Sequence, residues 1–260
     1  MAGSSKIHGL LYKMRNLDKQ YVLNSPTPTE RGELDVLIQI NSYISKIGKP
    51  ITVVAGKHTF KDIYGANKVD GTPKADIALV TYDGKKKKFV NVCFMSHKMG
   101  TDASGFQQYS GITTKADGPK TGSISTDKTV VAFLKKLTTF HSAIVDGKER
   151  FMRVVKDKVL IGKAVYGPLF GSSQYGIDNI HLIGQGDITF SKVGEKHKLN
   201  FTTHVSYNPD VKEFMNGDYT TIIGARYSSG RNYESGGKTY SGVRVLIMPK
   251  RLIGSKAQEI

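Results

Sequence analysis

The chain has 260 residues, which is enough for one large domain or two small ones, and either arrangement can bury a normal hydrophobic core. It carries 38 Lys and Arg against 22 Asp and Glu, a formal net charge of +16. This excess favours a polyanionic partner, nucleic acid above all, because binding releases condensed counterions. The single cysteine, Cys93, excludes a disulfide framework and a cysteine-rich zinc site within one chain.

A first helix is predicted over residues 30–47, after the turn-rich segment 24–29, with Thr29 as its N-cap. Gly48 and Pro50 end it. Residues spaced three or four apart form one buried face of this helix: Glu33, Leu37, Ile40, Ile44 and Ile47.

Two strand signals follow the helix. The β-branched run 51–55 predicts one strand, and the stretch 72–98 predicts two apolar strands joined by a lysine-rich turn. We then expect a short helix over 105–112, a mobile loop over 116–126 and a second amphipathic helix over 129–144. A helix, several strands and another helix predict an α/β layered core.

The sequence changes character near Gly162, where glycine and tyrosine become frequent. Strand-like runs at 187–190, 199–205 and 243–247 alternate with turns. We therefore expect a core over residues 1–160 and a β-rich, basic region over 161–260. Periodicity does not decide whether that region is a second domain or an elaboration of the first sheet.

The predicted hairpin places an acid and a base together. If its turn is 84–88, paired positions sum to 172, and Asp76 lies opposite Ser96. Because strand side chains alternate, Asp76, Ser96 and Lys98 then project from one face. A slip of one residue would move Asp76 to the other face. An acid and a lysine this close would hold each other charged if buried, whereas an ordinary surface ion pair is the alternative.

The segment Pro73-Lys-Ala-Asp76, an apolar strand, a turn, a second apolar strand and Ser96-His-Lys98 resembles the motif of the PD-(D/E)xK nuclease superfamily. The resemblance covers residues 30–112. It implies a restriction-endonuclease-like α/β core of helix, mixed sheet and helix. It also implies that Asp76 is the family's acid, that Lys98 is its lysine, and that Glu33, or else Glu30, is the glutamate of the preceding helix.

The resemblance further implies a metal site. Mg²⁺ or Mn²⁺ would be held by Asp76, Glu33 and the main-chain carbonyl of His97, since hard cations prefer oxygen ligands. Lys98 would orient the attacking water or neutralise charge at the phosphate. Glu33 also has a structural alternative, because an acid in the first turn of a helix complements the helix dipole.

The chain departs from the family at Ser96, where a second acid is usual, and Ser96 joins Asp76, Lys98 and Glu33 in the predicted catalytic set. A serine there predicts a weaker or one-metal site, or a domain that binds without cutting. The expected function is thus a restriction-like or phage-like endonuclease acting on DNA. A cleavage-deficient nucleic-acid-binding protein and a basic structural protein without a site are the alternatives.

Other residues are candidates for contacts with nucleic acid. The predicted helix 105–112 begins with Gln107 and Gln108, which could reach the metal site or the scissile strand, or could simply cover a helix surface. Further along the chain, tyrosines are interleaved with cations that suit phosphate contacts, although a solvated hairpin would look alike. These cations are Arg226, Arg231, Lys238 and Arg244.

Composition and termini set the remaining expectations. The sequence has no apolar run of about 18 residues, and its first residues lack the apolar core of a signal peptide. We expect a cytoplasmic protein of a bacterial or phage-infected host cell, with no membrane partner. DNA is the expected partner, RNA is not excluded, and the chain is compatible with a homodimer.

Overall fold

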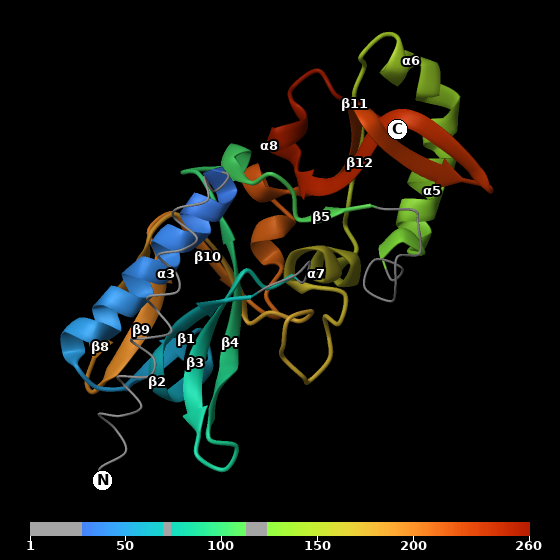
Figure 1. Ribbon diagram of the computed structural model, residues 1–260. Coiled ribbons are helices and arrows are strands. Elements are labelled where there is room, and N and C mark those ends of the chain that lie inside the picture. Colours follow the sequence, from blue (N-terminus) through green and yellow to red (C-terminus); the bar gives the residue numbers. More distant parts are fainter. Residues whose placement is uncertain (1–27, 70–73, 113–123) are drawn as a thin grey trace. The chain divides into compact units, whose positions relative to one another are not determined.

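The computed structural model describes residues 28–69, 74–112 and 124–260 (Figure 1). The chain folds into two units, and each is built from separate stretches of sequence. The first unit comprises residues 1–101 and 172–208, and the second comprises 102–171 and 209–260. This division does not coincide with the predicted boundary at residue 160. The predicted loop 116–126 lies mostly outside the described residues.

The first helix, α3, spans Pro28–Ile47 and begins two residues before the predicted start. Proline suits this end, since its fixed φ matches the first helical turn and its missing N–H is not needed there. The predicted apolar face is buried at Leu37, Ile40 and Ile44. The helix ends as predicted at Gly48, whose φ of +76° few other residues adopt and whose N–H donates to the Ile44 carbonyl.

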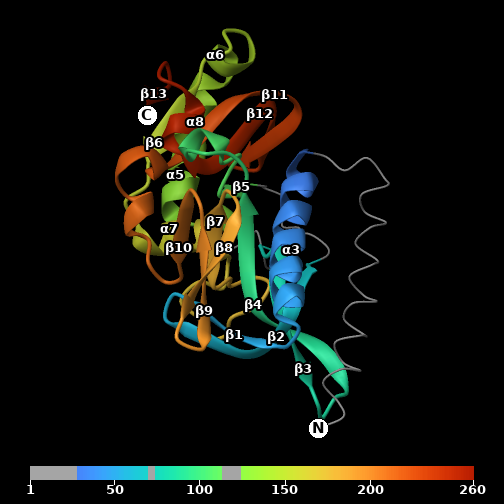
Figure 2. The same cartoon turned by 90° about the vertical axis from the view of Figure 1, so that its left-hand side faces the viewer.

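The first unit contains an eight-stranded mixed sheet in the order β10-β7-β4-β3-β2-β1-β9-β8. Strands β1 to β4 form an antiparallel meander, whereas β7 runs parallel to β4 and β9 parallel to β1. Helix α3 lies along this sheet and packs into its core (Figure 2). The strands are β1 (Ile51–Ala55), β2 (His58–Lys68), β3 (Ile77–Asp83), β4 (Lys88–Lys98), β7 (Leu182–Gln185), β8 (Ile188–Val193), β9 (Lys196–Phe201) and β10 (His204–Tyr207).

The β3–β4 hairpin reaches its predicted register at the open end by two departures that cancel. Its turn is shorter by one residue, so that Asp83 pairs with Lys88 and not with Phe89. A shift in register between Leu79 and Val80 then adds one residue to β4. Ile77 consequently pairs with Met95, which restores the sum of 172 beside Asp76.

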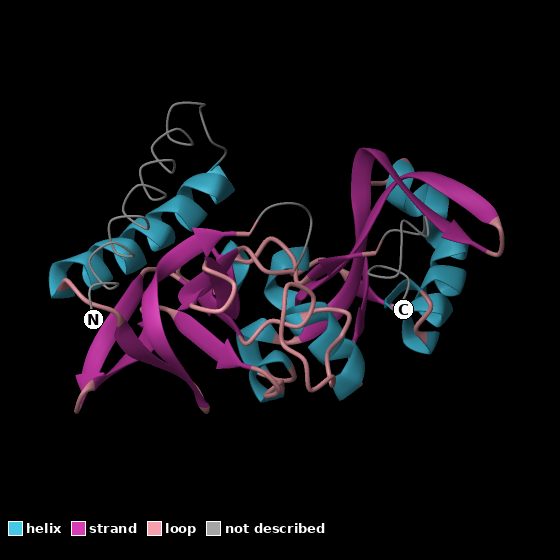
Figure 3. Ribbon diagram, turned by 60° about the horizontal axis from the view of Figure 1, so that its bottom comes forward, coloured by secondary structure: helices cyan, strands magenta, loops and turns pink. Residues whose placement is uncertain are grey.

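The second unit contains a five-stranded sheet in the order β13-β6-β11-β12-β5. Its main feature is the long hairpin of β11 and β12, a twisted ribbon in Figure 3. Its strands are β5 (Ser110–Gly111), β6 (Phe151–Val154), β11 (Thr221–Ser235), β12 (Lys238–Pro249) and β13 (Gln258–Glu259), and its helices are α5 (Lys128–Leu137), α6 (His141–Val145), α7 (Lys158–Tyr166) and α8 (Lys250–Ile253). None of the described helices is long and apolar enough to cross a membrane.

Two helix predictions need correction. The segment 129–144 is not one helix of the first core. It forms α5 and α6 of the second unit, separated by a 3-10 turn at Thr138–Phe140. Residues 105–112 are not helical beyond the short 3-10 turn Ala103–Gly105, because the Tyr109 and Ile112 amides donate to carbonyls of β12 and add this segment to the sheet edge.

A buried asparagine fixes α3 on the sheet. The pairing of β1 with β2 begins at Ile51 and Ile63, so β2 has no β1 partner beyond that point. There the Asn41 side chain takes the place of a strand. Its Nδ2 donates to the Ala66 carbonyl at 3.1 Å, and its Oδ1 accepts from the Ala66 N–H at 2.8 Å.

We predict that Asn41→Leu lowers the free energy of unfolding by about 2–5 kcal/mol, because it leaves two buried main-chain groups of Ala66 unpaired. Urea denaturation of the variant measures this loss. Ser42→Leu, at the adjacent exposed position, is the matched control and should change stability little. Equal stability of Asn41→Leu and the wild type would show that the clamp does not hold the helix.

Candidate active site

Asp76 lies immediately before β3, beside the end of β4. Its N–H donates to the Met95 carbonyl at 2.9 Å, and its own carbonyl accepts from the Val69 N–H at 2.9 Å. These main-chain bonds continue the pairing on both sides of β3 by one residue. The backbone at Asp76 is therefore fixed even though the residue stands outside the strand.

The Asp76 carboxylate is oriented by β4. Its Oδ2 accepts a hydrogen bond from the Ser96 hydroxyl at 2.7 Å and another from the His97 N–H at 2.8 Å. Ser96 is buried, with 1% of its surface exposed. Asp76 Oδ1 makes no hydrogen bond within the described part of the chain. The predicted neighbours Asp76 and Ser96 are thus in direct contact, and one carboxylate oxygen is available to another ligand.

Glu33 approaches the same place from the second turn of α3. Its side chain is 13% exposed, and Oε2 lies 3.5 Å from the Lys68 Nζ. Burial raises the pKa of Glu33, and the negative charge of Asp76 raises it further, whereas the charges of Lys68 and Lys98 lower it. The charges of Asp76 and Lys98 are therefore close enough to act on the Glu33 carboxyl. The side chain of the alternative residue, Glu30, lies outside the described residues.

A glycine allows α3 to come this close. A Cβ on Gly32 would lie 2.0 Å from Met99 Sδ and 3.3 Å from His97 Cε1. A side chain at this position would therefore have to displace the Met99 side chain. The His97 ring is itself 6% exposed and its Nε2 lies 3.1 Å from the Gly186 carbonyl, so it packs under the site. Burial lowers its pKa, so the imidazole is neutral at pH 7.

Two lysines at the site have no counterpart among the sequence predictions. Lys68 ends β2 and pairs in register with Ile77, the residue after Asp76. Lys74 is half-buried, and its pKa is lowered to about 7 by burial and by the charge of Lys98, against the opposing charge of Asp76. Only the β2–β3 register shows that Lys68 lies near Asp76, and this register cannot be read from the sequence alone.

The oxygen donors at this place fit a hard divalent cation to which the protein supplies few ligands. Two carboxylates, Glu33 and Asp76, repel each other across a partly buried region, and oxygen ligands of this kind suit Mg²⁺ or Mn²⁺. In an antiparallel pair, the N–H and C=O of a residue point to the same neighbour. The His97 N–H points to Asp76, so its carbonyl faces this edge too. Among the described residues, no group of three or more His, Cys, Asp or Glu is placed to hold a metal.

The predicted nucleic-acid contacts belong to the second unit. Gln107 and Gln108 precede β5 and do not begin a helix. Arg226 and Arg231 lie on β11, and Lys238 and Arg244 on β12. Gln108 Oε1 accepts a hydrogen bond from Arg244 Nη2 at 2.9 Å. These contacts tie Gln108 to the arginine-bearing hairpin.

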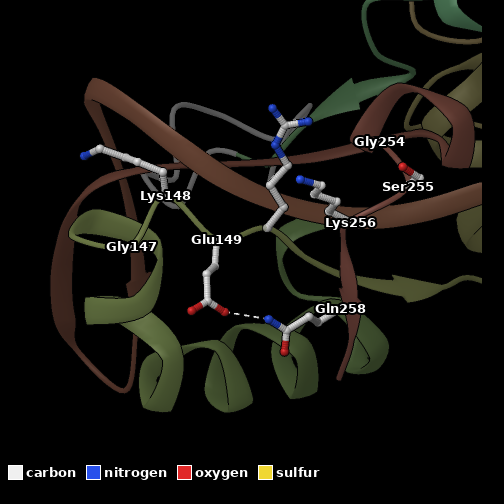
Figure 4. A pocket seen from close by; sticks show the side chains of 8 residues that line it. Gly147, Lys148, Glu149, Gly254, Ser255, Lys256 and Gln258 are labelled. Atoms are coloured by element: carbon white, nitrogen blue, oxygen red, sulfur yellow. Dashed lines mark hydrogen bonds between the residues drawn. The ribbon is translucent and has the colours of Figure 1, made fainter.

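The second unit also has a cavity of about 580 Å³ beside the turns at 147–150 and 254–258 (Figure 4). Three of its four charged side chains have protein partners. Glu149 accepts from Gln258, Arg150 donates to the Ile253 carbonyl, and Lys148 donates to the Val145 carbonyl. It contains no pair of facing carboxylates, so we do not assign the catalytic chemistry to it.

The sequence is similar to one curated protein of known activity. It is 30% identical over 198 residues to the type II restriction enzyme CviJI of Paramecium bursaria Chlorella virus IL3A, an alignment that covers 72% of this chain and 51% of that enzyme. The chain thus spans about half the length of that relative. No protein-family profile and no solved structure matches the sequence. The mixed α/β fold, with its large mixed sheet, is compatible with a nuclease fold.

Proposed function

We propose that the chain is a metal-dependent DNA endonuclease of the PD-(D/E)xK type that hydrolyses phosphodiester bonds. The observation that carries the proposal is the Asp76 carboxylate, which Ser96 and His97 of β4 hold beside β3, close enough to Glu33 of α3 to raise its pKa while Lys98 lowers it. The similarity to a type II restriction enzyme supports DNA as the substrate. The net charge of +16 supports a polyanion.

Each residue has a distinct part in the proposed reaction. Asp76, Glu33 and the His97 carbonyl would hold Mg²⁺ or Mn²⁺, which supplies charge neutralisation at the phosphorane and acidifies water. Ser96 and the His97 N–H fix the direction of the Asp76 carboxylate. The Lys98 ammonium orients the attacking water or stabilises negative charge on the phosphate. Lys68 keeps Glu33 close to the site through their 3.5 Å ion pair.

A second candidate is a nucleic-acid-binding protein that keeps this fold without cutting. The observation in its favour is Ser96, which replaces the usual acid. Its hydroxyl donates to Asp76 and so adds no negative charge for a cation. The first candidate function requires DNA cleavage, and the second requires that DNA is bound and not cut.

We predict that the wild type nicks or linearises supercoiled plasmid when a divalent metal is added and does nothing in EDTA. Asp76→Asn removes a charged ligand and Lys98→Ala removes the ammonium, so each should lower the rate by about 100-fold or more. Asp35→Asn, an exposed position on α3, is the control and should cut normally. An Asp76→Asn variant as active as the wild type contradicts the site assignment.

The departure at Ser96 gives a second prediction. Because the described part of the site offers two carboxylates, Glu33 and Asp76, Mn²⁺ should support more cleavage than Mg²⁺ at equal concentration. Ser96→Glu adds a charge and should lower the metal concentration needed for half-maximal cleavage. Ser96→Ala is the matched control, since it removes the hydrogen bond to Asp76 and adds no charge. If the wild type cuts with neither metal but Ser96→Glu cuts, the binding-protein candidate is correct.

The raised pKa of Glu33 predicts how stability depends on pH without metal. Because the folded-state pKa is above the unfolded value of 4.5, ionised Glu33 destabilises the fold, and stability falls as pH rises through this range. Glu33→Gln should therefore be more stable than the wild type at pH 7, by about 1.4 kcal/mol for each unit of the shift. The difference should vanish near pH 4. Urea denaturation in EDTA measures it, with Asp35→Asn as the control, and a Gln variant that is never more stable contradicts the electrostatics.

A further inference from the structure

The β11–β12 hairpin of the second unit places arginines of the same charge side by side. Arg226 lies directly opposite Arg244 in the strand register, so both side chains share one face of the sheet. Like charges in such a cross-strand pair destabilise it. Arg244 is also partly buried, which strengthens the repulsion.

A bulge brings a third arginine to this pair. Tyr227 pairs with Val243 and Asn232 with Ser241, so that the four residues 228–231 lie opposite Gly242 alone. In a regular strand, Arg231 would lie about 17 Å from Arg226. The bulge shortens this path. The pKa of Arg244 is lowered first by burial, then by Arg231, and then by Arg226, so both other guanidinium groups act on Arg244.

The positive glycine dihedrals show that the bulge is built into the sequence. Gly230 has a φ of +72° and Gly242 a φ of +80°, values that side chains rarely adopt. Bulges of this kind redirect a side chain and are frequent next to functional sites. The stretch that the sequence marks only as glycine-rich thus bends β11 and returns Arg231 to the pair.

Gln108 orients one member of the group. Its Oε1 accepts a hydrogen bond from Arg244 Nη2 at 2.9 Å, and it is uncharged, so it fixes the guanidinium without neutralising it. Among the described residues, no Asp or Glu forms an ion pair with Arg226, Arg231 or Arg244. The positive charge of the cluster is therefore uncompensated within the described chain.

We propose that Arg226, Arg231 and Arg244 form a phosphate clamp for the DNA backbone, with Gln108 as its positioning residue. This rests on the proposed function, since it names the part of the second unit that grips the substrate. Guanidinium groups suit phosphate because their planar forks bind two oxygens at once. An anion between them would relieve the repulsion that the hairpin imposes. Free phosphate offers the same oxygens, and the experiment separates it from DNA.

The test is fluorescence anisotropy with a labelled DNA duplex in EDTA, which removes cleavage from the measurement. Arg226→Gln and Arg231→Gln should each weaken binding about eightfold at 0.1 M salt and reduce the slope of log affinity against log salt by about one. Arg153→Gln is the control with the same charge change. Arg153 pairs with Ile223, so it lies on the opposite sheet face and should leave the slope unchanged.

Thermal unfolding without DNA gives a second readout that a structural role would not produce. Because Arg226→Gln removes repulsion, its melting temperature should rise by about 1–3 °C while its DNA affinity falls. Gln108→Ala should weaken DNA binding without changing the salt slope, since no charge is lost.

Three outcomes would overturn the clamp. In the first, the arginine variants bind DNA with the affinity and the salt slope of the wild type. In the second, Arg153→Gln loses as much DNA affinity as they do. The third is stabilisation of the wild type by inorganic phosphate with duplex affinity unchanged in the variants, which would make the cluster a free-anion site. If the arginine variants lose DNA affinity as predicted while the wild type cuts no plasmid, the clamp stands and the proposed endonuclease activity fails.

Discussion

The first unit depends on holding two carboxylates, Glu33 and Asp76, close together in partly buried surroundings. Both positions need support from elsewhere in the chain. Asn41 anchors α3 on the unpaired part of β2, and Gly32 lets the start of that helix touch the end of β4. The β3–β4 register then brings Ser96 and the His97 N–H to Asp76. Burial and the neighbouring charge of Asp76 make the ionised form of Glu33 unfavourable, as its raised pKa reflects.

The second unit also holds like charges close together, but there the charges are positive. There the β11–β12 hairpin gathers arginines, and burial together with the charges of Arg231 and Arg226 lowers the pKa of Arg244. We infer that each unit concentrates one kind of charge, and that each concentration is relieved by a complementary ligand. A divalent cation would serve the carboxylates and DNA phosphate the arginines. Repulsion held in place by the fold is common at functional sites, where interacting charges shift pKa values.

The sequence predicted the parts of the fold that follow from local pattern. The apolar spacing of α3 and its stop at Gly48 were sufficient for the helix, and the alternation of β3 and β4 for the hairpin. The contact between Asp76 and Ser96 followed from the register, although the turn was shorter than predicted and a bulge compensated for it. The roles of these residues stay predictions.

Other features were beyond reach because they depend on distant pairing. The spacing of Phe106 and Tyr109 imitates a helix, whereas both rings are buried in an aromatic cluster with Phe214 and Tyr219. Residues 182–207 return to the first sheet beside β4 and β1, which no local signal indicates. Lys68 reaches Glu33 through the β2–β3 register, and Arg231 reaches Arg244 through a bulge.

Calorimetric titration of Mn²⁺ into the metal-free protein tests the central claim most directly. Wild type should bind Mn²⁺ and release protons on binding at a pH near the raised pKa of Glu33, because the carboxyl must ionise to become a ligand. Glu33→Gln should bind more weakly and lose the proton release, and Asp76→Asn should not bind. Absence of Mn²⁺ binding by the wild type, or identical isotherms for all three proteins, would contradict the account.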